Sequence, residues 1–212
     1  MSAPVQATDR WAEFRQSQRE EFADSIIAAV SDPHAGALSV TEIVNRTGTS
    51  RKTFYKYFDS LSAAVVYTEK SVLRRLSDHA EAAVAIAASG RERLLAVLED
   101  NGRVATKSPE LFRFISFFDY TFRYTGIEEA DQRAFDSAMR ILYADAIDIF
   151  RAGQDDGSIR SDLEPEVTVA AISGAVIGLV QRHLAITSSS PNPQALLDMT
   201  ALEIAAWRAF LS

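Results

Sequence analysis

The fold is decided by the stretch Ser39–Phe58, which reads SVTEIVNRTGTSRKTFYKYF. Its first four residues, ending at Glu42, fit a capping box, in which the serine hydroxyl accepts from a backbone N–H and the carboxylate reaches back to the cap. Gly48 follows about two helical turns later, at a position where glycine reaches a left-handed conformation most cheaply. Ser50 then caps a second segment. The stretch therefore predicts two short helices joined by a glycine turn.

The second of these helices has an aromatic face and a cationic face. On a helical wheel, Phe54 and Phe58 lie about 40° apart and face inward, while Lys52 and Lys56 lie on the opposite side. An α-helix fits the major groove of a duplex, and lysine or arginine on it gains by counterion release. A lone helix of this kind is more often a solvated surface helix. The capped helix and turn that precede it favour a helix-turn-helix instead.

At these residues the sequence resembles the TetR family of transcriptional regulators, whose pattern runs roughly T-V-x-x-I-A-x-x-A-G-V-S-[KR]-G-T-[FL]-Y-x-[YH]-F. The resemblance implies an all-α protein with an N-terminal helix-turn-helix domain and a C-terminal helical bundle for ligand binding and dimerisation. It also implies a homodimeric repressor that binds a palindromic DNA operator and is released by a small-molecule effector. The matching residues are Ser39, Val40, Ile43, Gly48, Ser50, Arg51, Thr53, Phe54, Tyr55, Tyr57 and Phe58.

Nine residues of the stretch are candidate DNA contacts. The resemblance places some of them at positions that meet bases or the DNA backbone, and positive charge adds the others. Lys52 stands where the family usually has a small residue, which adds charge at the groove. Leu61 replaces a lysine that touches a phosphate in many relatives, so fewer phosphate contacts are expected. The candidates are Ser39, Thr41, Ser50, Arg51, Lys52, Thr53, Tyr55, Lys56 and Tyr57.

The rest of the chain also carries helix signals, with apolar residues recurring every three or four positions. The pattern predicts an all-α fold of about nine helices. We expect a helix-turn-helix DNA-binding domain over 1–59 and an effector-binding and dimerisation domain over 60–212. The expected helices cover 10–31, 40–46, 50–58, 60–88, 91–106, 109–124, 128–153, 165–187 and 193–211.

Residues 112–124, FRFISFFDYTFRY, hold seven of the 20 aromatic residues of the chain. Their rings point in nearly all directions around a helix, so two interpretations stay open. In the first, most of them fill the core. In the second, some line an apolar cavity for a small, apolar or aromatic effector, with tyrosines to orient it. The candidates for ligand binding are Phe114, Phe117, Phe118, Tyr120, Tyr124 and Tyr143.

The stretch Val167–Val180 is apolar on most faces, and its two glycines, Gly174 and Gly178, lie four residues apart. Its 14 residues are fewer than the ~18–20 that span a bilayer, so we expect no membrane contact. Close approach of another helix would offset the cost of mid-helix glycine. The resemblance implies a dimer interface in the last two helices, and an internal core is the alternative. The candidates are Ile172, Val176, Ile177, Leu197, Ile204 and Trp207.

The composition and charge of the chain limit the classes of function that we expect for it. The net charge is −7, but residues 1–60 hold seven basic and eight acidic side chains, so most of the acidity lies later. With no cysteine, three scattered histidines and no nucleotide-binding or hydrolase motif, we expect no metal, no cofactor and no enzyme activity. The start of the chain does not resemble a secretory signal, which favours a cytoplasmic location. The alternative function is a helical small-molecule-binding or interaction module that has lost DNA binding.

Overall fold

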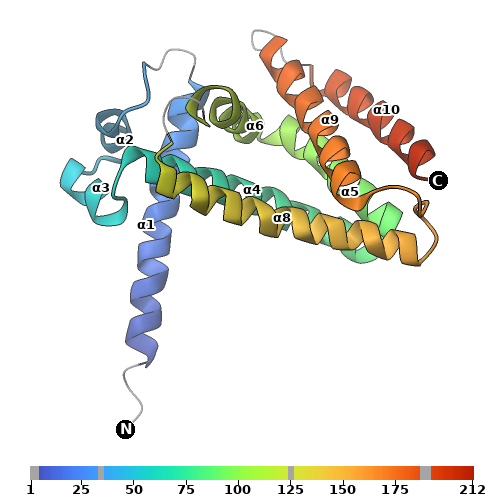
Figure 1. Cartoon of the computed structure of the whole chain (residues 1–212). Helices are drawn as coiled ribbons and strands as arrows, with labels where there is room; N and C mark the ends of the chain where they lie inside the picture. Colours follow the sequence, from blue (N-terminus) through green and yellow to red (C-terminus); the bar gives the residue numbers. More distant parts are fainter. Residues whose placement is uncertain (1–4, 33–35, 124–126, 187–191) are drawn as a thin grey trace. The chain divides into compact units, whose positions relative to one another are not determined.

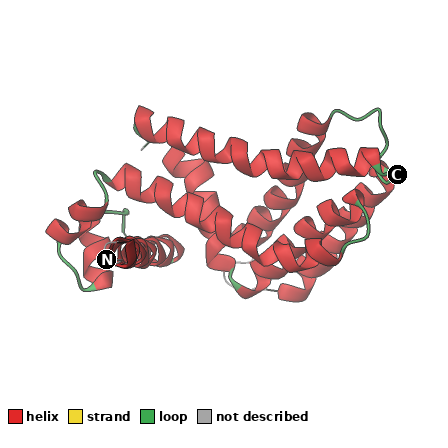
Figure 2. Cartoon of the chain, turned by 90° about the horizontal axis from the view of Figure 1, so that it is seen from below, coloured by secondary structure: helices red, strands yellow, loops and turns green. Residues whose placement is uncertain are grey.

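The computed structural model describes residues 5–32, 36–123, 127–186 and 192–212, and this part of the chain is helical with no strand (Figures 1 and 2). The predicted all-α fold is confirmed. The predicted helix over 109–124 changes character at Phe118, where a π-helix begins. The elements are α1 (Val5–Ser31), α2 (Val40–Thr47), α3 (Arg51–Tyr57), α4 (Leu61–Ile86), α5 (Gly90–Lys107), α6 (Pro109–Phe117), the π-helix η1 (Phe118–Phe122), α8 (Glu129–Asp155), α9 (Pro165–Ile186) and α10 (Pro193–Leu211).

Two compact units make up the chain. Unit 1 contains Met1–Val72 and Phe114–Arg133, and unit 2 contains Leu73–Arg113 and Ala134–Ser212. Unit 1 thus combines the first three helices with the start of α4 and the π-helix. The expected functional division between residues 59 and 60 stays a prediction.

The core of unit 1 is aromatic. Phe22 of α1 is buried and meets Phe54 edge-on, with ring centroids 5.5 Å apart. Phe58 lies 6.0 Å from Phe22 and 5.5 Å from Phe54. Edge-to-face pairs of this kind contribute about 0.5–1.5 kcal/mol each beyond the area they bury. The long α1 therefore holds the short α3, which could not persist as an isolated helix.

The core of unit 2 is aliphatic and joins α5, α8, α9 and α10. It includes Leu95, Phe150, Ile172, Val176 and Ile204, each at most 3% exposed. Three of these residues were expected in a subunit interface. That assignment is corrected, because Ile172, Val176 and Ile204 are buried within the chain and are not accessible to a second copy.

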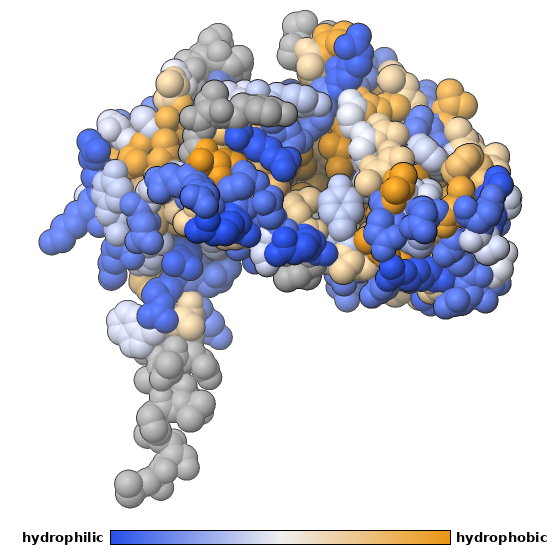
Figure 3. All heavy atoms as spheres, in the orientation of Figure 1, coloured by the Kyte–Doolittle hydropathy of each residue, from blue (hydrophilic) through white to orange (hydrophobic). Residues whose placement is uncertain are grey.

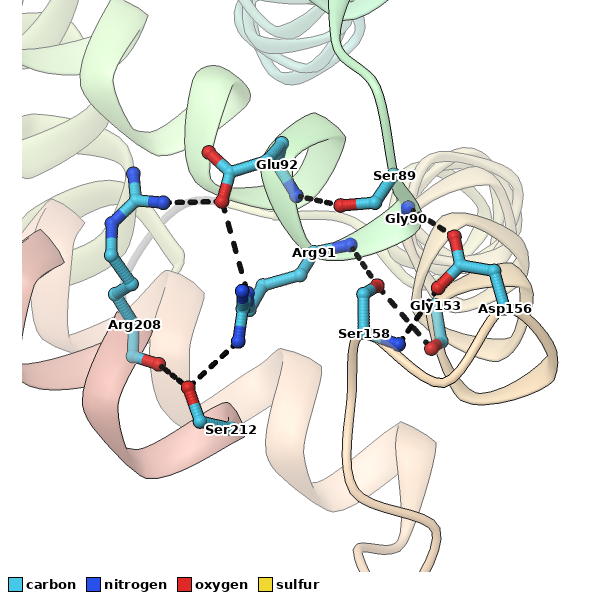
Figure 4. Close-up of polar contacts among 9 residues, drawn as sticks. All are labelled: Ser89, Gly90, Arg91, Glu92, Gly153, Asp156, Ser158, Arg208 and Ser212. Carbon is cyan, nitrogen blue, oxygen red and sulfur yellow. Dashed lines mark hydrogen bonds and ion pairs between the residues drawn. The ribbon is translucent and has the colours of Figure 1, made fainter.

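Close backbone packing and hydrogen bonds join the start of α5 to the end of α8 and the turn that follows it (Figure 4). A Cβ on Gly90 would lie 2.2 Å from the backbone nitrogen of Gly153, so only glycine fits there. The N–H of Gly90 donates to the Asp156 carboxylate at 2.8 Å, and the N–H of Arg91 donates to the Ser158 hydroxyl at 3.1 Å. Hydrogen bonds from Ser158 and then from Gly90 lower the pKa of Asp156. The first turn of α5 is thus capped by a distant segment.

Substitution of Gly90 by alanine tests this packing. We expect Gly90→Ala to lower the free energy of unfolding by about 2 kcal/mol or more, because the backbone of Gly153 cannot move aside cheaply. Gly36→Ala is the control, since a Cβ there meets nothing within 4 Å and Gly36 lies outside the helices proposed for the dimer. Alanine there should leave stability unchanged or raise it by up to about 1 kcal/mol, because it restricts the unfolded chain. Urea denaturation measures both, and equal effects of the two variants would contradict the account.

Candidate functional site

The first candidate site is the pair α2 and α3 with the turn between them. Ser39 caps α2 by accepting from the N–H of Glu42 at 3.2 Å. Gly48 ends α2 with a φ of 67°, and its own N–H donates to the carbonyl of Val44. Ser50 then caps α3 by accepting from the N–H of Thr53 at 3.1 Å. The capping and turn signals of the sequence are therefore confirmed, and they fix the direction in which α3 leaves α2.

The opposite faces of α3 differ as the sequence predicts. Phe54 is buried against Phe22, whereas Arg51, Lys52, Tyr55 and Lys56 are exposed. Hydrophilic side chains predominate on the visible surface of this region (Figure 3). The packing of Phe54 therefore holds the cationic side of α3 toward solvent.

The other predicted DNA contacts lie around this face. Thr41 and Ser50 are exposed, and Ser39 and Thr53 are half-buried. The Ser39 hydroxyl caps α2, and the Thr53 hydroxyl forms a hydrogen bond with that of Ser50. Tyr57 is different, because it is 7% exposed and its ring centroid lies 6.0 Å from that of Phe22. The ring of Tyr57 is thus part of the core of unit 1, and its role as a phosphate contact stays a prediction for the hydroxyl group.

Arg46, a further basic residue of the stretch Ser39–Phe58, is already paired with carboxylates. Arg46 pairs with Asp32 at 2.9 Å and with Glu42 at 2.6 Å, and these hydrogen bonds raise the pKa of its guanidinium. Its charge is thus largely compensated by two carboxylates. Arg51, Lys52 and Lys56 remain as the exposed cations of this face.

Sequence reasoning missed a residue that positions α3. Arg19 of α1 donates to the backbone carbonyl of Tyr57 at 3.2 Å, at the end of α3. Its guanidinium also lies 5.7 Å from the ring centroid of Phe58 and 5.8 Å from that of Tyr67. A cation favours the C-terminal end of a helix and the faces of aromatic rings. No local pattern in the sequence predicts this contact, because the two residues lie 38 positions apart.

The second candidate site is an apolar cavity in unit 2 of about 170 Å³. It lies among α4, α5, α8 and α9, and its lining is mostly apolar. Of the predicted ligand-binding residues, Tyr143 lies in this lining. The other lining residues are Leu73, Leu76, Ser77, Val97, Leu98, Asn101, Met139, Asp145, Ala146, Ile149, Ser173 and Ile177.

The remaining predicted ligand-binding residues belong to unit 1 and do not line this cavity. Phe114 and Phe118 are fully buried and pack in the core of unit 1, with ring contacts to Phe117 and Phe122, so their role in ligand binding stays a prediction. Phe117 is half-buried and stacks near Phe122, and Tyr120 is 70% exposed. Tyr124 lies outside the described residues. The aromatic stretch therefore serves mainly the core, as the first of the two interpretations held.

Unit 1 also buries a carboxyl group. Glu69 of α4 is 2% exposed, and its Oε2 atom has no hydrogen-bond partner. Burial and, to a lesser degree, the nearby Asp119 raise the pKa of Glu69 to about 8, against the opposing effect of Arg123. The group is thus mostly protonated at pH 7, and it lies near enough to Asp119 of the π-helix to be affected by that charge. Across the described part of the chain, no cluster of three side chains is arranged to hold a metal ion.

The structure is that of a helix-turn-helix protein with a larger helical bundle, and comparison with solved structures identifies the fold more closely. A putative TetR-family transcriptional regulator from Rhodococcus sp. is 17% identical, covers 91% of this chain and 99% of its own, and has a TM-score of 0.74. The fatty acid degradation regulator FadR from Bacillus halodurans is 12% identical over 88% of this chain and 94% of its own, with a TM-score of 0.71. The fold is therefore that of the TetR family of transcriptional regulators, and the predicted resemblance is confirmed.

Sequence comparison points the same way over a shorter range. The HTH-type transcriptional regulator BetI of Rhizobium meliloti (strain 1021) is 30% identical over 93 residues, which are 44% of this chain. The match spans about half, 46%, of that relative. No protein-family model matches the sequence.

The buried carboxyl group predicts a pH dependence of stability. The folded chain keeps the Glu69 proton up to a pH of about 8, whereas the unfolded chain releases it near 4.5. The folded state binds more protons between these values, so the free energy of unfolding should fall as the pH rises, by up to about 1.4 kcal/mol per unit. Glu69→Gln should remove this dependence and make the chain more stable than wild type at pH 8.

Urea denaturation at pH 5 and pH 8 measures the effect. Glu81→Gln, an exposed carboxylate on the same helix, is the control and should differ little from wild type at either pH. A stability difference between Glu69→Gln and wild type that is equal at both pH values would contradict a neutral Glu69.

Proposed function

We propose that this chain is a DNA-binding transcriptional regulator that acts as a homodimer, with α3 as the helix that enters the major groove. The observation that carries the proposal is the exposed cationic face of α3, which Phe54 anchors to the core of unit 1. Arg51, Lys52 and Lys56 can neutralise phosphates there, and Tyr55 and Thr53 can reach bases or the DNA backbone. The regulators that share the fold support this reading.

A dimer follows from the reach of α3, which has seven residues and can read only a few base pairs. Two copies related by a dyad would read a palindrome whose half-sites lie about 34–36 Å apart, or a multiple of that distance. We infer that repression is the mode of action and that the protein works in the cytoplasm, where its DNA target would lie.

The outer surface of α9 and α10 supports the dimer. The helix α9 has 22 residues and is long and apolar enough to cross a membrane. The expectation of no membrane contact used only the shorter stretch Val167–Val180, so the length of that stretch no longer supports it. Only 28% of the most apolar window of α9 is buried in the chain. Apolar side chains also stand among polar ones on the visible surface of α9 and α10 (Figure 3).

We propose that a second copy covers this surface. Val167 of α9 and Leu202 of α10 are 69% and 74% exposed, and a Cβ on Gly174 or Gly178 would meet nothing within 4 Å. These open glycines leave room for a close helix–helix contact. Of the interface residues that the sequence predicted, Leu197 and Trp207 are half-buried and stay in the proposed interface, whereas Ile177 is half-buried and lines the cavity of unit 2.

The proposed effector site is the cavity in unit 2. A ligand that prefers a conformer with the two α3 helices at the wrong separation would weaken operator binding by that same preference, typically about 1–3 kcal/mol. The FadR protein of Bacillus subtilis, which shares the fold with a TM-score of 0.67, 13% identity and coverage of 88% of this chain and 95% of its own, was solved in complex with stearoyl-CoA.

Removing the two lysines of α3 tests DNA binding. A gel-shift assay with the intergenic region upstream of the gene should show tight binding by wild type that weakens steeply between roughly 50 and 200 mM salt. Lys52→Ala with Lys56→Ala should lower the affinity at least about tenfold and reduce the salt slope by about 2, because about 0.9 counterion is released per phosphate contact.

The double variant Lys70→Ala with Lys107→Ala removes the same charge from exposed positions on α4 and α5 and serves as the control. It should bind DNA nearly as wild type does. Equal DNA affinities of the two double variants would contradict the assignment of α3 as the helix that enters the major groove. Failure of wild type to bind any duplex at low salt would favour the helical module that has lost DNA binding.

A charge on the outer surface of α10 tests the dimer. Leu202→Glu should raise the dissociation constant of the dimer at least about tenfold, because a carboxylate would be buried without a partner. Ile86→Glu is the control, since Ile86 is 87% exposed on α4 and lies outside the proposed interface. Sedimentation equilibrium reports the masses. A monomeric wild type, or equal dissociation of both variants, would contradict the proposed interface.

A further inference from the structure

We propose that the cavity of unit 2 takes a compact ligand about the size of one aromatic ring, which is neutral or carries an amine, and that it excludes anions. This inference rests on the proposed function in one respect, namely that the cavity is the effector site. Its evidence is the volume of the cavity and the charges of the residues that line it.

The volume sets the size of the ligand. The cavity measures about 170 Å³. An engineered apolar cavity of about 150 Å³ binds benzene, whereas sites for drug-sized molecules run from about 300 to 1,000 Å³. A single ring with a short substituent therefore fits, and a long acyl chain does not fit without a rearrangement of the helices.

The lining sets the hydrophobicity of the ligand. Leu76 and Leu98 are buried, and Met139, Ile149 and Ile177 are half-buried around the same space. These side chains come from α4, α5, α8 and α9, so a ligand would bury its apolar surface against all four helices. Burial of apolar surface contributes about 25 cal/mol per Å².

The charged residues that line the cavity determine whether a bound ligand can be anionic or cationic. Among the described residues that line the cavity, Asp145 is the charged one, and no lysine, arginine or histidine accompanies it. A carboxylate or phosphate in this space would lose hydration without gaining a cation, which costs several kcal/mol. An ammonium group near Asp145 would gain a partner instead. Asn101, Tyr143 and Ser173 offer further polar groups to a neutral ligand.

This chemistry separates the chain from a structural neighbour. The FadR protein of Bacillus subtilis was solved with stearoyl-CoA, a long and anionic molecule. The cavity here is too small for such a chain and lacks a basic residue in its described lining. The shared fold therefore presents a different ligand class in this protein.

Three probes of nearly equal shape test the charge preference. Isothermal titration of the full chain, without DNA, should show binding of 2-phenylethylamine and 2-phenylethanol. Phenylacetate should bind at least about tenfold more weakly than either, because its carboxylate meets no cation. Equal binding of phenylacetate, or absence of binding by all three probes, would overturn the inference.

Two pairs of variants locate the binding. Ala146→Phe fills the cavity and should abolish binding of the amine, whereas Ala144→Phe, on an exposed part of the same helix, should not. Asp145→Asn should weaken the amine about threefold to fivefold, as an exposed ion pair does, and leave the alcohol unchanged. Asp148→Asn, an exposed carboxylate one turn along α8, is its control. Equal effects within either pair would place the ligand elsewhere and overturn the inference.

The gel-shift assay separates this inference from the proposed function. Selective amine binding by a chain that binds no DNA would overturn the proposed regulator and leave the ligand class standing. DNA binding together with tight binding of phenylacetate would support the proposed regulator and overturn the proposed ligand class.

Discussion

The packing of Phe22 against Phe54 and Phe58 is the contact on which the candidate DNA interface depends. A seven-residue helix has too few internal hydrogen bonds to persist alone, so α3 exists because these rings hold it against α1. The same rings set the rotation of α3 and therefore the direction of its lysines. Removal of one such buried ring costs about 3–5 kcal/mol, comparable to the whole stability of a small domain. Arg19 adds a cation at the end of the helix and fixes it from the other side.

Charge placement explains how an acidic protein can approach DNA. The chain carries a net charge of −7, which repels a duplex from most of its surface. The cations Arg51, Lys52 and Lys56 stand on one face of one helix, while Arg46 is neutralised by two carboxylates. An attractive patch on a repulsive body favours a single orientation of approach. This arrangement favours one orientation over non-specific affinity, which is what the proposed regulator needs in order to bind one site among many.

Much of this could be read from the sequence, and the failures have one physical cause. Caps and turns are local, so the helix boundaries around Gly48 and the two faces of α3 were predictable. Periodicity shows that a helix face is buried but not what buries it. Ile172 was therefore assigned to a second copy although it packs inside the chain. The burial of Glu69 near Asp119 joins residues far apart in the sequence, which no local pattern encodes.

The central claim is that two copies of α3 read one duplex at a fixed separation. Selection of binding sites from a pool of random duplexes by the full-length protein tests it most directly. The account predicts enrichment of a palindrome whose half-sites lie about 34–36 Å apart, or a multiple of that distance, and loss of the enrichment when Lys52 and Lys56 are replaced by alanine. Enrichment of sites without two-fold symmetry, or of none at all, would contradict it.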